Sequence, residues 1–329
     1  NFFSYIYIVN RNIMNLGYAC INMTLGKQKP KVTTNRSMIK RTFLEKGVHY
    51  AGELGLQNSR DLFTILEWNN KNNVKLFRLS SDMFPWASEY GLENSPYYKR
   101  IGTILEACGH YANKHGIRVT AHPGPFNVLV SPNPKVVDNT ITDLEIHGKI
   151  FDMIGLSRTP YNKLNIHCNG VYGDKQSAMD RFCKNFEKLS PAVQGRLTVE
   201  NDDKASMYSV KDLMYIHERI GIPIVFDYHH HLFNTGGLTE QEALELAIST
   251  WPEDIKPIVH YSESKMLHEG NEKIKPQAHS DYISKVPHTY GNDVDIMVEA
   301  KAKELAILPF INSTRCEYSG LRSTSSYEN

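Results

Sequence analysis

The chain has 329 residues, of which 41% are hydrophobic and 22% are charged, and this composition excludes a disordered, collagen-like or coiled-coil protein. The formal net charge of +1 excludes a nucleic-acid binder that is basic over its whole surface, although it allows a local basic patch. The five cysteines are dispersed without a CxxC pair, which favours a reducing compartment over a disulfide scaffold. The 14 histidines raise the expectation of metal chemistry.

The two ends of the chain differ in character from its middle. Residues 1–13 precede Met14, and we interpret them as an upstream extension or as the remnant of an organelle-targeting segment. Residues 311–329 are rich in serine and threonine and predict a loose tail. The intervening residues 14–310 contain no repeat or long linker, so we expect one domain. No run approaches the ~20 apolar residues that cross a bilayer, so we expect a cytoplasmic or nuclear protein that does not bind membranes.

Short apolar runs alternate along the chain with longer segments of helical period. The predicted strands are Leu16–Cys20, Lys75–Ser80, Ile117–His122, Lys163–Cys168, Arg196–Glu200, Pro223–Tyr228, Ile258–His260 and Asp295–Glu299. The predicted helices between them are Ser59–Asn70, Tyr98–His115, Asp138–Gly155, Lys175–Leu189, Val210–Ile220 and Thr239–Ser249.

This alternation is typical of parallel β/α units, and eight strands predict a closed (β/α)8 TIM barrel. An open, doubly wound sheet is the structural alternative, but no glycine-rich dinucleotide fingerprint follows the first strand. The polar residues 264–276 predict a loop insertion after the seventh strand.

Ionisable side chains lie at the ends of six consecutive predicted strands, where barrel enzymes carry their chemistry. They are His122, His167, Glu200, Asp227 with His229 to His231, His260 and Glu299, and His279 and Asp281 lie in the loop after strand seven. Buried ionisable groups cost free energy unless they are paired or bind a metal. Imidazoles and carboxylates without a thiolate motif fit Zn, Mn or Fe, and their number exceeds the roughly four to six ligands of one ion. The sequence therefore predicts a multinuclear centre, which suits phosphodiester hydrolysis.

Nine short motifs run in order along almost the whole chain. They are Leu16-Gly17-Tyr18 with Asn22, Phe77–Ser81 with Phe84-Pro85, His122-Pro123-Gly124, Ile166-His167 with Tyr172–Lys175, Val199–Asp202, Phe226–His230, His260–Ser262, His279–Tyr282 and Glu299–Glu304. Each motif alone is unspecific, but together they resemble the UV damage endonucleases and, more distantly, the endonuclease IV family of abasic-site nucleases. This resemblance implies a barrel that binds damaged double-stranded DNA and cuts 5′ to a UV photoproduct or other lesion, leaving a 3′-hydroxyl and a 5′-phosphate.

The resemblance also implies two or three divalent ions, with Mn²⁺ foremost and Zn²⁺ or Mg²⁺ as alternatives. Glu200 is expected to bridge two of them, and the catalytic role is carried over to Glu200, His122 and His260. The implied ligand sets are His122 and His167 for one ion, Asp227, His260 and Glu299 for a second, and His230, His279 and Asp281 for a third. We expect a monomer, because a barrel that faces DNA needs no partner.

A basic segment follows the first strand and contains Lys27, Lys29 and Lys31 without any acidic residue between positions 26 and 44. A solvated charge run is the simple interpretation, but its place after a barrel strand favours a loop that contacts phosphates. The resemblance places Tyr18 among the residues that probe DNA, and Asn22 belongs to the same motif.

The chain departs from the family pattern at three places. Glu89 stands where many relatives have a histidine after the Phe-Pro motif, and its carboxylate could still coordinate a metal. Pro125 and Phe126 stand where the family usually has a Gln-Tyr wedge, and Ile258 stands where the family has a lysine that acts at the metals in a carboxylated form. We therefore expect that the nuclease chemistry is kept and that the lesion range is shifted, for example toward abasic sites.

The residues leave two other functions open. One is a metal-dependent sugar isomerase or epimerase on a related barrel, which uses fewer ligands, so the third ligand set argues against it. The other is a DNA-binding protein with degenerate catalysis.

Overall fold

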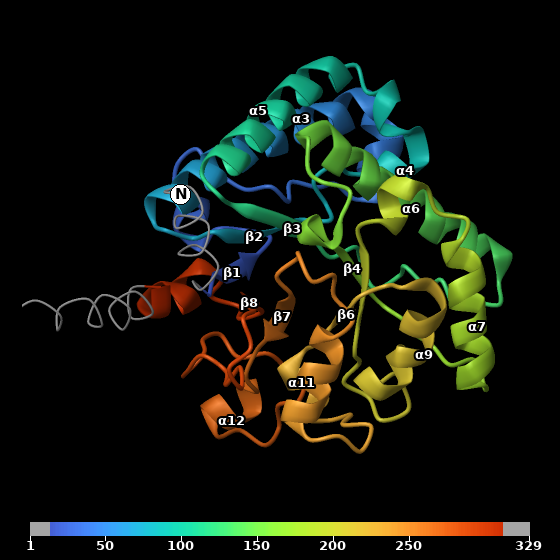
Figure 1. The fold of residues 1–329 in the computed structure, drawn as a ribbon. Coiled ribbons are helices and arrows are strands. Elements are labelled where there is room, and N and C mark those ends of the chain that lie inside the picture. The colour runs from blue at the N-terminus through green and yellow to red at the C-terminus, as the bar shows by residue number, and fades with distance from the viewer. Residues whose placement is uncertain (1–13, 312–329) are drawn as a thin grey trace, which may run out of the picture.

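The computed structural model describes residues 14–311, so the interpretations of residues 1–13 and 312–329 concern parts outside the described residues. Eight parallel strands form one sheet in the order β6-β5-β4-β3-β2-β1-β8-β7 (Figure 1). The barrel closes between the two ends of this order, because the His260 backbone N–H donates to the Phe226 carbonyl at 2.8 Å. The predicted TIM barrel is confirmed.

The strands are short and agree closely with the predicted ones. They are β1 Leu16–Ala19, β2 Leu76–Leu79, β3 Arg118–Ala121, β4 Leu164–His167, β5 Leu197–Glu200, β6 Ile224–Val225, β7 Ile258–Tyr261 and β8 Asp295–Val298. Only β6 differs from its predicted bounds by more than one residue at an end. It stops early because the Asp227 side chain accepts the His230 backbone N–H and caps the next helix.

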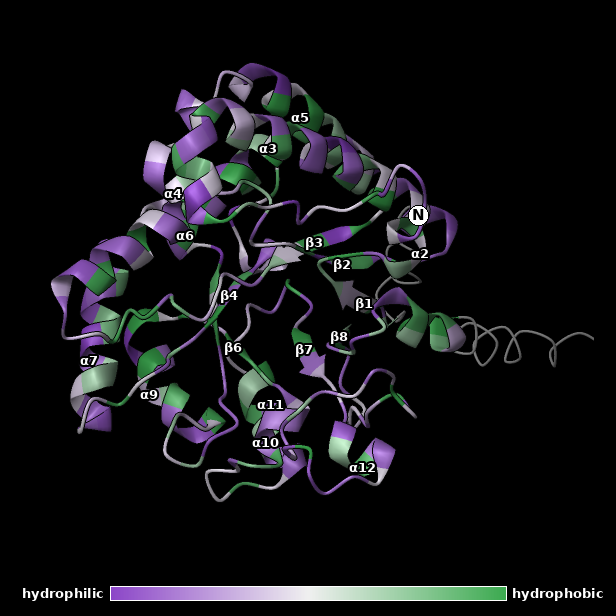
Figure 2. Ribbon diagram, turned by 180° about the vertical axis from the view of Figure 1, so that it is seen from behind, coloured by the Kyte–Doolittle hydropathy of each residue, from purple (hydrophilic) through white to green (hydrophobic). Residues whose placement is uncertain are grey.

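The helices surround the sheet, and α3, α5, α6, α7 and α9 carry both hydrophobic and hydrophilic residues along their length (Figure 2). The helices are α2 Met23–Gly26, α3 Lys40–Lys71, α4 Ala87–Tyr90, α5 Tyr98–Lys114, α6 Pro134–Ile154, α7 Lys175–Phe186, α8 Pro191–Gln194, α9 Val210–Ile220, α10 Tyr228–His231, α11 Glu240–Ile248 and α12 Lys265–Glu269, with 3₁₀ turns at Leu92–Asn94 and Pro160–Asn162. Within residues 14–311, no helix combines the length and the apolar character needed to cross a membrane.

Several boundaries differ from the sequence prediction. The helix predicted from Asp138 begins at Pro134, and the helix predicted to end at Leu189 ends at Phe186. The helix predicted from Ser59 begins at Lys40, because a second helical stretch precedes it and joins it at a kink at Gly47, whose φ is 64°. The predicted loop 264–276 contains the short helix α12, which ends at Gly270 in the left-handed conformation. Ile311, which the sequence pattern places in the tail, is buried against the core.

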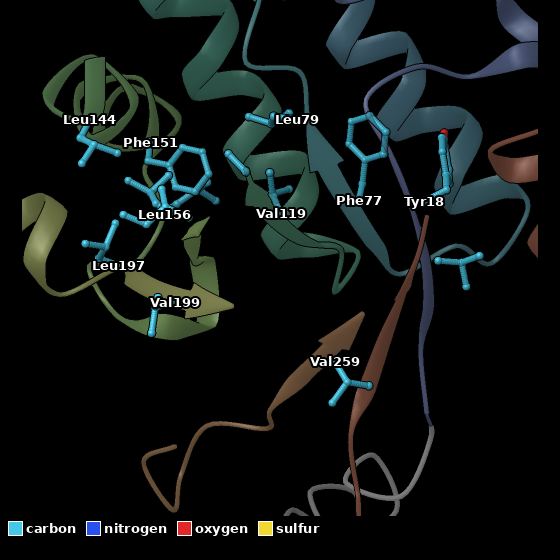
Figure 3. Packing of buried hydrophobic residues seen from close by; sticks show 14 of the residues in the cluster. Tyr18, Phe77, Leu79, Val119, Leu144, Phe151, Leu156, Leu197, Val199 and Val259 are labelled. Atoms are coloured by element: carbon cyan, nitrogen blue, oxygen red, sulfur yellow. The ribbon is translucent and has the colours of Figure 1, made fainter. Parts of the chain in front are cut away.

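The two faces of the strands form two apolar layers. The larger layer lies between strands and helices and includes Phe77 and Val119 on the strands and Leu144 and Phe151 of α6 (Figure 3). The smaller cluster contains Ala19, Leu76, Val225, Trp251, Ile258 and Met297. Ile258 is therefore a fully buried packing residue in this chain.

A buried ion pair joins the amino-terminal ends of β3 and β8. The Arg118 guanidinium is 3.2 Å from the Asp295 carboxylate and also donates to the carbonyls of Tyr161 and Lys256, each at 2.7 Å. Asp295 accepts two further bonds from Asn15. Both charged side chains are almost fully buried, so each one compensates the charge of the other in a place that water cannot reach.

Removing one partner should therefore destabilise the barrel. We expect Asp295→Leu to lower the free energy of unfolding, measured in urea, by about 3–5 kcal/mol, because Arg118 would keep a buried charge without its counterion. Glu45→Gln, in the exposed Arg41–Glu45 pair, is the control and should leave the unfolding midpoint unchanged. Equal midpoints for both variants would contradict this account of Arg118.

Candidate metal centre

Four imidazoles surround one buried carboxylate at the carboxyl ends of the strands. Glu200, the last residue of β5, is 1% exposed. Its Oε2 lies 3.3 Å from His122 Nε2, 3.8 Å from His167 Nε2 and 3.1 Å from His260 Nδ1. Its Oε1 lies 3.3 Å from His230 Nδ1. The structure thus brings together side chains from four different strand ends and the turn after β6.

Two more carboxylates complete this cluster. Glu299 Oε1 lies 3.3 Å from His260 Nδ1, and Glu299 Oε2 lies 3.7 Å from His279 Nδ1. Two groups offer ligand atoms within 4.8 Å of one another, namely His122 with His167 and Glu200, and Glu200 with Asp227 and His230. Glu200 belongs to both groups. Asp227 is grouped with His230, although the sequence assigned these two residues to different ions.

Three histidines are oriented by a hydrogen bond from Nδ1. Such a bond fixes the ring and its tautomer, and it leaves Nε2 as the atom that can bind an ion. These contacts join His122 to the Pro123 carbonyl at 3.1 Å, His230 to the Asn201 carbonyl at 2.8 Å and His279 to the Glu299 carbonyl at 3.0 Å. His167 Nδ1 lies 3.1 Å from the Asp202 carboxylate as an ion pair.

The carboxylates of the cluster are also held by neighbours. Asn165 donates to Glu200 Oε2, and Thr198 donates to the Asn165 side chain at 2.8 Å. Asn201 bonds to the backbone of Asp227 through both atoms of its amide. Surrounding bonds therefore fix the acidic side chains before any ligand binds.

The atoms that face the middle of this cluster lack hydrogen-bond partners. Glu200 Oε1, Asp227 Oδ2 and His260 Nδ1 are buried polar atoms without one among the described residues. A buried polar atom without a partner costs free energy. Nitrogen and oxygen atoms that converge in this way fit divalent cations, so the residues present suit the metals that the sequence predicts.

The charges of the cluster point to the same conclusion. Burial and the nearby Glu200 and Glu299 raise the pKa of Asp227. Burial would also raise the pKa of Glu200, but the neighbouring histidines hold it well below its usual range. Burial lowers the pKa of His122 to about 4, whereas Asp227, Glu200 and Glu299 overcome burial and raise the pKa of His230 to about 10. Negative charge concentrated in a buried space favours cations.

Sequence reasoning missed two cations of the cluster. Lys163 is fully buried, and its Nζ lies 2.9 Å from His260 Nε2. Burial lowers the pKa of this amine to about 7. Arg78 of β2 pairs with Glu299. A signal existed for Lys163, because the alternation of a strand places positions 163, 165 and 167 on one face, together with the predicted ligand His167.

The third predicted ligand set is only partly assembled. The His279 ring centroid lies 6.3 Å from that of His230 and 5.3 Å from that of His229, at the rim of the cluster. Asp281 is about half exposed, and its carboxylate pairs with Lys265 at 3.2 Å. The expectation that Asp281 binds a metal is therefore not supported by its position.

The predicted DNA-binding residues fall into two classes. Tyr18 and Asn22 are buried, because the Tyr18 hydroxyl donates to Asn69 at 2.7 Å and accepts a bond from Asn22. The expectation that they contact DNA is corrected here, since both side chains fasten β1 and α2 to the core. Lys27, Lys29, Lys31, Pro125 and Phe126, in contrast, are all exposed.

The basic segment stays at the carboxyl end of the barrel. Thr34, just after it, donates to the carbonyl of Cys20, which directly follows β1, at 2.8 Å. Arg36 pairs with Asp61 of α3 at 2.7 Å and fastens the chain after the segment to the barrel. Because the segment directly follows β1 and α2 and is tied back to Cys20, Lys27, Lys29 and Lys31 lie on the side of the barrel where the cluster opens.

Comparison with known proteins gives consistent matches over the whole barrel. The sequence profile of the UV-endonuclease UvdE family matches residues 14–328. A UV-damage endonuclease of Schizosaccharomyces pombe is 36% identical over 305 residues, which are 89% of this chain and 49% of that protein. A UV DNA damage endonuclease of Bacillus cereus is 32% identical, over 91% of this chain and 94% of that protein. The chain thus spans about half the length of the yeast relative and almost all of the bacterial one.

The solved structures give the same picture. The crystal structure of SacUVDE superposes with a TM-score of 0.80 at 30% identity and covers 93% of this chain and 99% of that one. A D-psicose 3-epimerase from Clostridium cellulolyticum superposes with a TM-score of 0.51 at 10% identity, which shows a shared barrel fold and nothing more.

Metal binding should release a proton at His230 and not at His122. With a pKa of about 10, His230 is protonated at pH 7 in the metal-free protein, so an ion must displace that proton and binds more tightly as the pH rises toward 10. His122, with a pKa of about 4, is already neutral. We expect His230 to contribute about one proton per chain when Mn²⁺ is titrated by calorimetry in buffers of different ionisation enthalpy, and His167, whose pKa Glu200 and Asp202 raise against the effect of burial, to add to this release.

Two variants test the assignment of this proton. His230→Asn should lower the release at saturating Mn²⁺ by about one proton per chain, whereas His122→Asn should weaken binding and leave the number of released protons unchanged. If both variants released the same number of protons as the wild type, the charge state inferred for His230 would be wrong.

Proposed function

Because this chain belongs to the UV-endonuclease UvdE family, we propose that it is a metal-dependent DNA repair endonuclease. Its substrate is damaged double-stranded DNA, and it hydrolyses the phosphodiester 5′ to a UV photoproduct or other lesion to leave a 3′-hydroxyl and a 5′-phosphate. The observation that carries this proposal is the convergence of His122, His167, His230 and His260 on the buried carboxylate of Glu200. No apolar barrel core requires such a cluster.

We infer that the cluster holds two or three divalent ions, with Mn²⁺ as the first candidate and Zn²⁺ or Mg²⁺ as alternatives. Glu200 would bridge two ions. His122 and His167 would serve the first, and Asp227 and His230 would serve the second. The remaining candidates are His260, Glu299 and, at the rim, His279.

Divalent ions in such sites activate water and stabilise the charge that develops on a phosphate during hydrolysis. The protein's own contribution is to hold the ligands in place. Asn165 fixes Glu200, and Arg78 holds Glu299. Because these groups are positioned in advance, little reorganisation is needed when the substrate phosphate arrives.

DNA would reach this centre along a surface that carries both positive charge and an exposed ring. Lys27, Lys29 and Lys31 are placed to neutralise backbone phosphates. Phe126, which is 64% exposed, is placed to enter the base stack near a lesion. Pro125 and Phe126 lack the amide and the hydroxyl of the Gln-Tyr pair, and this difference favours a lesion range that extends to abasic sites. Tyr18 and Asn22 take no part, since both are buried.

Glu200→Gln should remove most of the incision activity without unfolding the protein. The amide keeps the shape of the side chain but loses the negative charge that would bridge two ions, so we expect incision to fall at least about 100-fold. The measurement is cleavage of an end-labelled duplex with one cyclobutane dimer, in the presence of Mn²⁺, and circular dichroism reports the fold. Glu245→Gln on α11 is the matched control. Wild-type incision by Glu200→Gln would disprove the assignment of the centre.

Neutralising Lys27, Lys29 and Lys31 together with glutamine should weaken duplex binding and flatten its dependence on salt. Each lost phosphate contact lowers the slope of log K against log[salt] by about 0.9, so three contacts give a change of roughly 2.7. Fluorescence anisotropy at several salt concentrations measures this slope. The same change at Lys114, Lys184 and Lys188, which are exposed lysines near the C-terminal ends of α5 and α7 on the opposite side of the barrel, should leave the slope as in the wild type. An unchanged slope in the first variant would contradict the proposed role of the segment.

A further inference from the structure

We propose that Tyr172 stacks on a base of the bound DNA and acts with Phe126 as a pair of aromatic contacts beside the metal centre. This inference rests on the proposed function for its ligand. Tyr172 lies in the loop after β4, whereas Phe126 lies in the loop after β3. The sequence motifs did not mark Tyr172 as a DNA-binding residue.

The loop between β4 and α7 presents Tyr172 at the carboxyl end of the barrel. Tyr172 follows the candidate ligand His167 by five residues, and its side chain is 50% exposed. A tyrosine that served only to pack the loop would bury its ring, because exposed aromatic surface loses the gain of burial. The ring therefore offers contact area just beside the cluster.

The backbone of this loop is held in an unfavourable conformation. Tyr172 has a φ of 48°, in the left-handed region that bulky residues rarely adopt, and Asn169, Gly170 and Gly173 also have positive φ values. The hydroxyl of the buried Tyr208 donates to the Gly170 carbonyl at 3.0 Å and holds the loop against the core. The Tyr172 ring lies so close to Gly170 that a Cβ there would be 2.7 Å from its Cε2. Strain of this kind persists where the surrounding contacts enforce it, and it is concentrated at functional sites.

Contacts of Asn169 connect this loop to the loop of Phe126. The Asn169 side-chain amide lies 3.4 Å from the carbonyl of Pro125 and 3.4 Å from that of Asn127, the two residues that flank Phe126. At the base of the two loops, the rings of His122 and His167 are 5.3 Å apart. The exposed rings of Phe126 and Tyr172 thus stand on neighbouring loops that are joined to each other and to two candidate ligands.

A cation lies next to the Tyr172 ring. The Arg181 guanidinium is 5.7 Å from the ring centroid, and its Nε donates to the Val130 carbonyl at 2.7 Å. The ring can therefore keep this contact while its exposed surface receives a base. Stacking on an aromatic side chain suits any base, because every base has a π face.

The chemistry of this surface favours DNA as the partner. A phosphate that reaches His122 and His167 brings its neighbouring bases to the loops that follow these two residues. The exposed lysines 27, 29 and 31 lie at the same end of the barrel and supply contacts for the backbone. A site for an apolar peptide would not need this basic flank.

The test compares Tyr172→Ala and Tyr172→Phe with the wild type on a duplex that carries one cyclobutane dimer. Fluorescence anisotropy gives the Kd, the incision assay gives kcat/KM, and 2-aminopurine beside the lesion reports base unstacking. Tyr215→Ala is the matched control, because Tyr215 also lies over an arginine, Arg219, at 4.1 Å, but on the outer helix α9. Thermal melting by circular dichroism shows that each variant is folded.

We expect Tyr172→Ala to raise the Kd by roughly 5- to 150-fold, which is the range for the loss of one stacked base, and to reduce the 2-aminopurine signal. Tyr172→Phe and Tyr215→Ala should both stay within about twofold of the wild type, because the first keeps the ring and the second lies far from the DNA. Wild-type binding by Tyr172→Ala would overturn the inference, and so would an equal loss in Tyr172→Phe or in Tyr215→Ala.

The same data separate this inference from the proposed function. Binding that depends on Tyr172 without any incision by the wild type would overturn the endonuclease and leave the contact standing. Incision that is equal in the wild type and Tyr172→Ala, with equal Kd values, would overturn the contact and leave the endonuclease standing. A wild-type protein that binds no duplex would overturn both.

Discussion

A carboxylate that is buried among imidazoles is the constraint on which the rest of this site depends. Glu200 lies at the end of β5 with almost no exposed surface, and one of its oxygens has no hydrogen-bond partner among the described residues. Two more acidic side chains, Asp227 and Glu299, share the same buried space. Such a concentration of negative charge is stable only with cations nearby. Arg78 and the buried Lys163 supply part of the positive charge that balances these carboxylates. Divalent ions would supply the remainder.

The candidate metal centre and the buried ion pair that stabilises the fold lie at opposite ends of the barrel. The pair of Arg118 and Asp295 joins strands at the amino-terminal end, whereas the ligand cluster lies at the carboxyl end. Ile258 belongs to an apolar cluster between these two polar regions. A lysine at position 258 would place an amine in this apolar cluster. In this chain, the amine of Lys163, which directly precedes β4, contacts His260 instead. Loops at the carboxyl end can therefore change their contacts with DNA without weakening the other end.

Much of the fold and of the ligand set could be predicted from the sequence, because both follow from local periodicity. Apolar runs marked the strands, and the ionisable residue that ends each run marked the site, as at His122 and Glu200. Long-range packing could not be predicted in this way. Tyr18 is buried with its hydroxyl bonded to Asn69, some fifty positions later on α3, and Asp281 is half exposed and paired with Lys265 of the unpredicted helix α12. No sequence pattern near Tyr18 or Asp281 predicts these partners.

The central claim is that this centre cuts DNA beside a lesion, and incision of defined duplexes tests it most directly. Protein with a measured metal content is incubated with end-labelled duplexes that carry a cyclobutane dimer, an abasic site or no damage, and the ends of the products are mapped. The account predicts a cut immediately 5′ to the dimer that leaves a 3′-hydroxyl, and no cut in undamaged DNA. Cutting of the abasic duplex alone would keep the chemistry and reject the photoproduct as substrate. No incision of any duplex by protein that contains its metal ions would contradict the account.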